Sequence, residues 1–110
     1  HKWRTVQAAA LDAMPHGRFV RVAGLVINRQ RPGTASGVIF MTLEDETGSI
    51  NVVLWPWVVQ QQRRLVIGSR LLRVHGKVER QGRVIHVIGG HLFDHSEWLG
   101  RLRTRSRDFH

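Results

Sequence analysis

The sequence predicts an all-β fold, a five-stranded Greek-key barrel, from three observations. The 110-residue chain contains five extended apolar segments, and one helical segment separates the third from the fourth. Gly24 lies in the middle of the long first segment, where a strongly curled strand needs a bulge or a bend. This order of elements is that of a five-stranded, partly open barrel. A chain of this length is expected to form one compact domain with a real core.

The N-terminal segment predicts a helix. Residues 3–14, WRTVQAAALDAM, end before Pro15 and Gly17, which stop helices. Apolar residues recur on one face at helical spacing: Trp3, Val6, Ala10 and Met14. The chain begins with His1 rather than Met, so we expect a piece of a longer protein. Residues 1–16 are therefore interpreted as a helix and linker that follow a preceding domain.

Three strands are predicted next along the chain. Residues 18–31, RFVRVAGLVINRQR, are interpreted as a long first strand. Residues 32–37, PGTASG, are turn formers and make a loop. The second and third strands are residues 38–44 and 49–55, joined by the turn DETG at 45–48.

Residues 44–46, at the end of the second strand and the start of this turn, are three of the eight acids of the chain in consecutive positions. Asp45 is suited to accept hydrogen bonds from the backbone two residues on, and the Thr47 hydroxyl supports the same turn. Gly48 can adopt the positive φ that other residues resist. A magnesium site needs carboxylates that converge from different elements, whereas adjacent side chains at a hairpin tip diverge. The pattern favours turn chemistry over a metal site or an acid–base pair.

The second half of the chain predicts a short helix and two more strands. Pro56 ends the third strand, and residues 57–66 have helical spacing. Residues 70–80 and 83–93 alternate apolar and polar positions, and the turn at 81–82 joins them as a hairpin. With a helix between its third and fourth strands, this barrel is predicted to be an OB-fold.

The barrel is expected to span residues 17–93 and to be followed by a basic tail at 94–110. Trp98 and Leu102 are four residues apart and indicate a short helix over an apolar patch. The tail could bind nucleic acid, dock on a partner or be disordered, because alternate residues are arginines: 101, 103, 105 and 107.

Charge indicates the class of ligand. The chain has 17 Lys and Arg against 8 Asp and Glu, a formal net charge of +9, and most of the cations are arginine. Arginine binds phosphate with a planar fork of donors and stacks on bases, so nucleic acid is the expected partner. The absence of cysteine excludes a disulfide framework and thiolate metal ligation. No apolar run reaches the ~20 residues of a membrane span, and we expect a cytoplasmic protein.

The alternation of the second and third strands predicts a face for stacking bases. Asn51 is polar in an otherwise apolar strand, so its side of the strand is expected to face solvent. Phe40 and Trp55 fall on that same side, and exposed aromatic rings on a strand are platforms for unstacked bases. The alternative is that either ring packs beneath a helix or the tail. Trp57, in contrast, is expected in the core.

Basic residues are expected to border that aromatic face. In an OB-fold the first loop and the last hairpin rise on either side of the binding surface. Arg29 and Arg31 lead into the first loop, and Arg80 and Arg83 flank the last hairpin turn. A further pair on the fourth strand could extend a track for the phosphate backbone: Arg73 and Lys77. The alternative is that these arginines are simply solvated.

The sequence indicates neither a catalytic nor a metal site. His91 and His95 have a four-residue spacing, but His91 ends a predicted strand, where that spacing does not favour zinc. His75 and His86 are expected to make local polar contacts. No Ser-His-Asp or Cys-His set and no phosphate-binding glycine loop is evident. We therefore expect no catalytic site and no cofactor within this chain.

Several stretches resemble one known family. FMTLEDETGSINVVLWP, at 40–56, is similar to the segment from strand two to strand three of OB-folds in bacterial C-family DNA polymerases and class II aminoacyl-tRNA synthetases. VRVAGLVINRQR, at 20–31, resembles the first strand in both. LLRVHGKVERQGRVIHVIGGHLFD, at 71–94, resembles strands four and five of the polymerase domain. The closing SRDFH, at 106–110, is similar to the end of error-prone C-family polymerases.

The resemblance implies a C-terminal OB-fold domain of an error-prone polymerase, related to the replicative alpha subunit and associated with the bacterial mutasome. The implied function is binding of single-stranded DNA during damage-induced mutagenesis and translesion synthesis. The implied parent is a DNA-directed DNA polymerase, a nucleotidyltransferase whose aspartates and magnesium lie outside this chain. Two alternatives remain: a module that docks mutasome proteins or the sliding clamp, and an anticodon-binding domain of a class II aminoacyl-tRNA synthetase.

Overall fold

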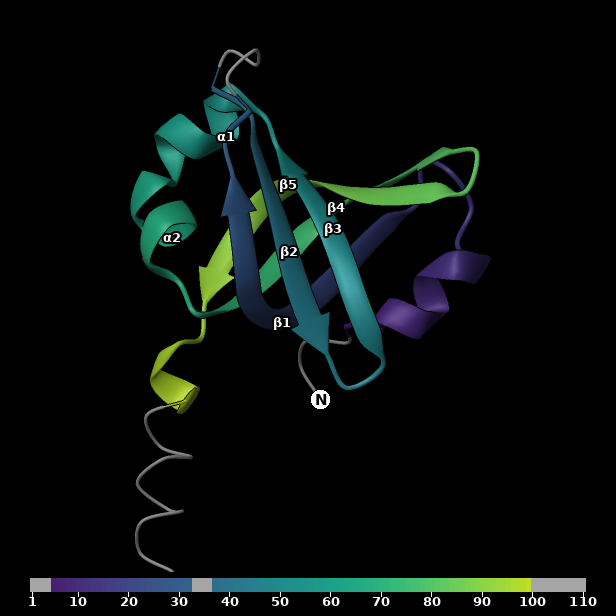
Figure 1. The fold of residues 1–110 in the computed structure, drawn as a ribbon, viewed down its shortest axis with the longest axis horizontal. Helices are drawn as coiled ribbons and strands as arrows, with labels where there is room; N and C mark the ends of the chain where they lie inside the picture. The colour runs from purple at the N-terminus through teal and green to yellow at the C-terminus, as the bar shows by residue number, and fades with distance from the viewer. Residues whose placement is uncertain (1–4, 33–36, 100–110) are drawn as a thin grey trace, which may run out of the picture.

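The computed structural model describes residues 5–32 and 37–99, which form a closed five-stranded barrel with short helices (Figure 1). The order of strands around the barrel is β1, β2, β3, β5, β4, which confirms the predicted OB-fold architecture. The elements are η1 (Ala8–Ala13), β1 (Phe19–Gln30), β2 (Ile39–Asp45), β3 (Gly48–Leu54), α1 (Pro56–Gln61), α2 (Arg63–Gly68), β4 (Leu71–Gln81) and β5 (Val84–Asp94).

Closure of the barrel depends on the long first strand. The first half of β1 pairs with β4 and the second half pairs with β2, both antiparallel, while β3 and β5 close the barrel as a parallel pair. Gly24 lies where β1 passes from one partner to the other. A Cβ at this position would lie only 2.6 Å from the carbonyl oxygen of Glu44, so the close approach of β1 and β2 requires glycine. The irregularity in the pairing of β1 with β2 lies between Val26 and Asn28, while Gly24 permits the close approach of the two strands.

The core lies inside the barrel and follows the alternation of the strands. Ile39, Met41 and Leu43 of β2 are each at most 5% exposed, as the sequence pattern predicts. The other strands and the helices add further buried apolar side chains, including Val22, Ile50, Val52, Leu54, Val58, Val66, Leu72, Val74, Val78 and Val87. Removing alternate side chains from water in this way is the main driving force for the barrel.

The helical segment between β3 and β4 is two short helices instead of the single helix predicted for residues 57–66. Gln62 separates them with φ −125° and ψ 33°, outside the helical region. The Gln62 side chain donates to the carbonyl of Gly90 (3.1 Å) and accepts from the amide of Leu92 (2.8 Å), both on β5. Gln62 thus supplies hydrogen bonds to the β5 backbone. In Figure 1, α1 and α2 lie together at one side of the barrel.

The N-terminal segment is not the α-helix predicted for residues 3–14. Only Ala8–Ala13 is helical in the described part of that segment, and it is a 3-10 helix. The amide of Val6 donates to the carbonyl of Arg21 in β1 (2.7 Å), which holds the preceding residues extended. The amide of Ala8 donates to the Asp45 carboxylate (2.7 Å). Tertiary hydrogen bonds therefore override the local helical pattern, and Trp3 lies outside the described residues.

The acidic turn between β2 and β3 has the structural role predicted for it. One carboxylate oxygen of Asp45 accepts from the Thr47 amide (2.7 Å), the Thr47 hydroxyl (2.7 Å) and the Gly48 amide (3.1 Å). Gly48 has φ 151°, a positive value that favours glycine. Burial alone would raise the pKa of Asp45, but these hydrogen bonds and the one from Ala8 together lower that pKa below its usual value.

A bulge in the β4–β5 pair is built from glycines. His75 pairs with His91, but the next residue, Gly76, pairs with Gly89, so Gly90 is an extra residue on β5. A Cβ on Gly76 would lie 2.2 Å from the carbonyl oxygen of Ile88, which only glycine avoids. A Cβ on Gly90 would meet only the His75 carbonyl oxygen, at 3.6 Å. The close approach of β4 and β5 beside this bulge therefore depends on Gly76.

The C-terminal region is described as far as residue 99. A helical turn begins at Glu97 and contains Trp98, which agrees with the helix predicted there. Trp98 is 41% exposed. Leu102 and the arginines at 101, 103, 105 and 107 lie outside the described residues. Among the helices that the structure describes, none has the length and apolar character needed to cross a membrane.

Candidate nucleic-acid interface

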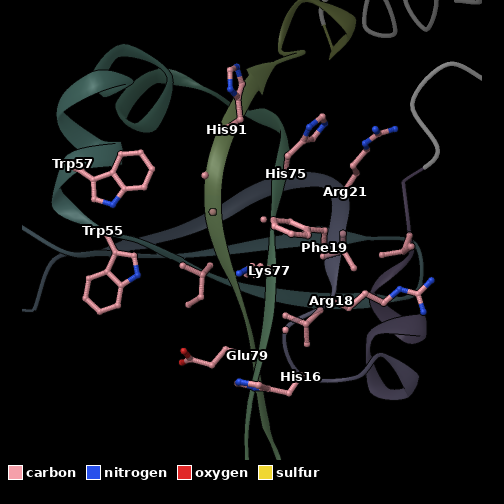
Figure 2. A pocket seen from close by; sticks show the side chains of 18 residues that line it. His16, Arg18, Phe19, Arg21, Trp55, Trp57, His75, Lys77, Glu79 and His91 are labelled. Atoms are coloured by element: carbon pink, nitrogen blue, oxygen red, sulfur yellow. The ribbon is translucent and has the colours of Figure 1, made fainter.

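A groove of about 850 Å³ crosses the outer surface of β1, β4 and β5 and reaches the junction of β3 with α1 (Figure 2). Three aromatic side chains with large exposed fractions line it: Phe19 at 76%, Trp55 at 45% and Trp57 at 56%. Figure 2 shows the two tryptophans on one side of β5 and Phe19 on the other. The glycines of the bulge, Gly76, Gly89 and Gly90, also line the groove.

Strand register builds the groove from side chains that are distant in sequence. Phe19 of β1 pairs with Lys77 of β4, and the Lys77 ammonium lies 5.0 Å from the centroid of the Phe19 ring. A cation over an aromatic face is attracted by the ring quadrupole, which holds the two groups together. Three rows of paired residues cross β1, β4 and β5: Ala23 with Arg73 and Phe93, Arg21 with His75 and His91, and Phe19 with Lys77 and Ile88.

The groove is basic. Arg18, Arg21 and Lys77 line it, whereas Glu79 is the one carboxylate among its described lining residues. Three histidines also line it: His16, His75 and His91. A concave surface that combines cations with exposed rings can hold the phosphates and the bases of a single strand at the same time.

Two residues predicted for the site, Trp55 and Lys77, line this groove together. Two others, Phe40 and Asn51, lie on the outer surface of β2 and β3, which we call the β2–β3 face. Phe40 is 38% exposed and Asn51 is also exposed, so this side of the strands faces solvent as predicted. The register connects the two surfaces in one lateral row, from Phe40 through Val53 and Ile88 to Lys77.

Arg29 and Arg80 are also among the residues predicted for the site. Both make structural contacts with the backbone instead of bordering an exposed binding face. The Arg29 guanidinium donates to the carbonyl of Val66 (2.7 Å) and to that of Ser69, and so ties β1 to α2. The Arg80 guanidinium donates to the carbonyls of Asp12 (2.8 Å) and Met14 (3.1 Å), and so ties β4 to the N-terminal segment. Each arginine therefore satisfies carbonyls in the last turn and at the C-cap of a short helix, which the helix itself leaves unpaired.

Arg73 is buried, with only 6% of its surface exposed. Its guanidinium carbon lies 4.1 Å from the centroid of the Phe93 ring. Burial and the nearby Arg21 lower the pKa of Arg73 below its usual value. Arg73 therefore adds positive charge beneath the surface and does not extend an exposed track along β4.

The two other predicted arginines, Arg31 after β1 and Arg83 in the β4–β5 turn, are exposed.

Sequence reasoning missed several residues of the groove. Trp57 was expected in the core, but its side chain is 56% exposed, because α1 buries Val58 and Val59 instead. Phe19 had a local signal, since it stands between Arg18 and a buried valine at the start of a strand. The residues that lie across the groove from Phe19 are determined by the closure of the barrel, which no local sequence pattern encodes.

His75 on β4 and His91 on β5 both pack against the ring of Phe93. The rings of His75 and His91 lie 4.7 Å and 4.6 Å from the Phe93 ring, between centroids. Burial, followed by the charges of Arg73, Arg21 and His91, lowers the pKa of His75. Within residues 5–32 and 37–99, no group of three or more His, Asp or Glu side chains is arranged to hold a metal ion.

Comparison with known families agrees with this geometry. Residues 20–93 match the family model described as an OB-fold nucleic acid binding domain, and the chain belongs to that family. The chain is 58% identical over 107 residues to the error-prone DNA polymerase of Alkalilimnicola ehrlichii and 56% identical over 107 residues to that of Azoarcus sp.. Each match covers 97% of this chain and 10% of the relative, so the chain spans about a tenth of their length.

Solved structures share the fold. The asparaginyl-tRNA synthetase of Pyrococcus horikoshii in complex with asparaginyl-adenylate aligns with a TM-score of 0.71 at 23% identity, over 84% of this chain and 22% of that one. An OBody bound to hen egg-white lysozyme aligns with a TM-score of 0.67 at 18% identity, over 84% of this chain and 93% of that one. At these identities the likeness concerns the barrel alone.

Proposed function

We propose that this chain is the single-stranded DNA-binding OB domain of an error-prone DNA polymerase that acts in damage-induced mutagenesis and translesion synthesis. The observation that carries the proposal is the groove, where Phe19, Trp55 and Trp57 surround a basic surface. Exposed rings stack on unpaired bases of any sequence, and each stack contributes ~1–3 kcal/mol. A duplex keeps its bases stacked inside the helix, so it cannot use these rings in the same way.

The choice of polymerase over tRNA synthetase rests on sequence similarity. The relatives that are 50–58% identical over 97% or more of this chain are error-prone DNA polymerases. The synthetase shares the fold at 23% identity. A translesion enzyme works on a template whose bases are unpaired ahead of the primer, and a sequence-tolerant stacking groove suits that substrate.

The test is a titration of the 110-residue chain with a fluorescent single-stranded oligonucleotide at several salt concentrations. We expect binding that is tighter than to the matching duplex, with log affinity falling linearly with log salt. Lys77→Ala should weaken binding by about 1 kcal/mol and flatten the salt slope, because one phosphate contact is lost. Arg64→Ala is the matched control, since Arg64 is an exposed arginine on α2 outside the groove.

Two results would contradict the proposal. A tRNA preference over oligonucleotides of the same length would favour the anticodon-binding alternative. Absence of affinity even at low salt would favour the docking alternative, in which the surface recruits mutasome proteins or the sliding clamp.

A further inference from the structure

Arg21, His75 and His91 form a row across three strands at one end of the groove. Arg21 of β1 is the register partner of His75 of β4, and His75 is the partner of His91 of β5. All three side chains line the groove, and Figure 2 shows them near one another, beyond the Phe19 ring. Directly paired residues on one face of a sheet have Cβ atoms within reach of a shared small ligand.

This row differs from the rest of the groove in its chemistry. Each of its three side chains carries ring or guanidinium nitrogens, whereas the neighbouring row has one nitrogen-bearing side chain, Lys77, between the apolar Phe19 and Ile88. No carboxylate is among the groups that influence His75: they are Arg73 on its own strand, Arg21 on β1 and His91 on β5. Like charges in such a cluster repel one another, and an anion would relieve that repulsion.

We propose that Arg21, His75 and His91 form a subsite for one backbone phosphate of a single strand whose bases lie against the rings of the groove. This inference rests on the proposed function, because it assigns the place of one phosphate within that binding groove. Arg21 supplies a permanent charge and a fork of donors, which suits phosphate oxygens. The two imidazoles donate fully only when protonated.

Protonation is therefore linked to DNA binding. In the free protein, burial and then the charges of Arg73, Arg21 and His91 lower the pKa of His75, which favours the neutral form of its ring. A bound phosphate diester carries a negative charge at every relevant pH and raises the pKa of the His75 imidazole beside it. The complex takes up protons, and affinity rises as the pH falls through the pKa of the complex.

The test measures affinity for a fluorescent dT oligonucleotide at about pH 8 and about pH 6 with constant ionic strength. We expect the unmodified chain to bind at least about three-fold tighter at the lower pH, within the limit of about ten-fold per pH unit for each proton taken up. His75→Gln/His91→Gln should remove this pH dependence, since glutamine does not titrate. His86→Gln is the matched control, because His86 lies on β5 outside the groove.

Arg21→Ala should weaken binding at both pH values and reduce the salt slope by about 0.7, the contribution of one phosphate in single-stranded DNA. Retention of the full pH dependence by the double histidine variant, with DNA still bound, would overturn the subsite and leave the proposed function intact. Complete absence of DNA binding by the unmodified chain would overturn both.

Two further measurements complete the test. The first requires no variant to fold, and the second distinguishes a DNA phosphate from a free phosphate ion. Histidine side-chain NMR of the unmodified chain should show the pKa of His75 rising when the oligonucleotide is added; an unchanged value would refute the subsite. Inorganic phosphate at the same ionic strength should not displace the oligonucleotide. Displacement would assign the row to a free anion rather than to DNA.

Discussion

The β2–β3 face and the groove both expose aromatic rings on the outer surface of the same barrel, but their charges differ. Neither β2 nor β3 contains a lysine or an arginine, and β2 ends in Glu44 and Asp45. The groove places Arg18, Arg21 and Lys77 beside its rings. Its rings are also more exposed, with Phe19 at 76% against Phe40 at 38%. An exposed ring on a strand thus marks a possible stacking platform, while the neighbouring cations decide which platform can also hold a phosphate backbone.

The largest expected effect is the loss of DNA affinity when rings are removed from the groove and the β2–β3 face is left unchanged. Phe19→Ala/Trp57→Ala should weaken binding of single-stranded DNA by about 2–6 kcal/mol, because two stacking surfaces are lost. Ile67→Ala is the control, since Ile67 is 53% exposed on α2 and does not line the groove. The measurement is fluorescence anisotropy at fixed salt. Equal affinity for the double variant and the unmodified chain would move the binding site out of the groove.

The turn between β2 and β3 should affect stability without affecting the groove. Gly48→Val places a β-branched residue at a positive φ, and we expect the free energy of unfolding to fall by about 1–3 kcal/mol. DNA affinity of the folded fraction should stay unchanged. Thermal and urea unfolding measure the first quantity. An unchanged melting temperature would show that the backbone at Gly48 does not need glycine.

Phe40→Ala tests the β2–β3 face and should have a smaller effect than the groove variant. We expect a loss of about 1 kcal/mol in DNA affinity, because one partly exposed stack is removed, and no change in salt slope, because no charge is removed. A loss as large as that of Phe19→Ala/Trp57→Ala would make the two regions one continuous binding surface.

Two arginines from the same stretch of chain should behave differently. Arg31→Ala should reduce DNA affinity by up to about 1 kcal/mol and flatten the salt slope, as for an exposed cation near phosphate. Arg29→Ala should instead lower the melting temperature, since it removes hydrogen bonds to Val66 and Ser69. Both variants are compared with the unmodified chain by DNA titration at several salt concentrations and by thermal unfolding. Interchanged results would mean that Arg29 leaves α2 to bind DNA.

The smallest effect concerns pH. The pKa of Asp45 is lowered in the folded protein, so its contribution to stability is present above the pKa of the unfolded chain and is lost as the pH falls through the folded value. Asp45→Asn should therefore make the free energy of unfolding less dependent on pH in the acid range. Urea unfolding at a series of acid pH values measures this, and identical pH profiles for both proteins would contradict it.

The amino-acid sequence by itself determined the barrel and its turns. Alternation in β2 assigns Met41 to the core and Phe40 to solvent, since successive side chains of a strand point to opposite faces. The spacing of Asp45, Thr47 and Gly48 determined the turn, because every hydrogen bond within it spans two or three residues. Such short-range relations can be evaluated without knowing the rest of the fold.

The tertiary structure alone decided which outward side chains become neighbours. Alternation gives the side of a strand but not its partner. Phe19, Trp57 and Lys77 line one groove only because β1 pairs with β4, β4 with β5 and β5 with β3. It also decided which arginines remain available. Arg80 is held by carbonyls more than 60 residues away in sequence, and Arg73 is covered beside Phe93. Burial of a long charged side chain depends on such distant groups, so local sequence patterns cannot assign it.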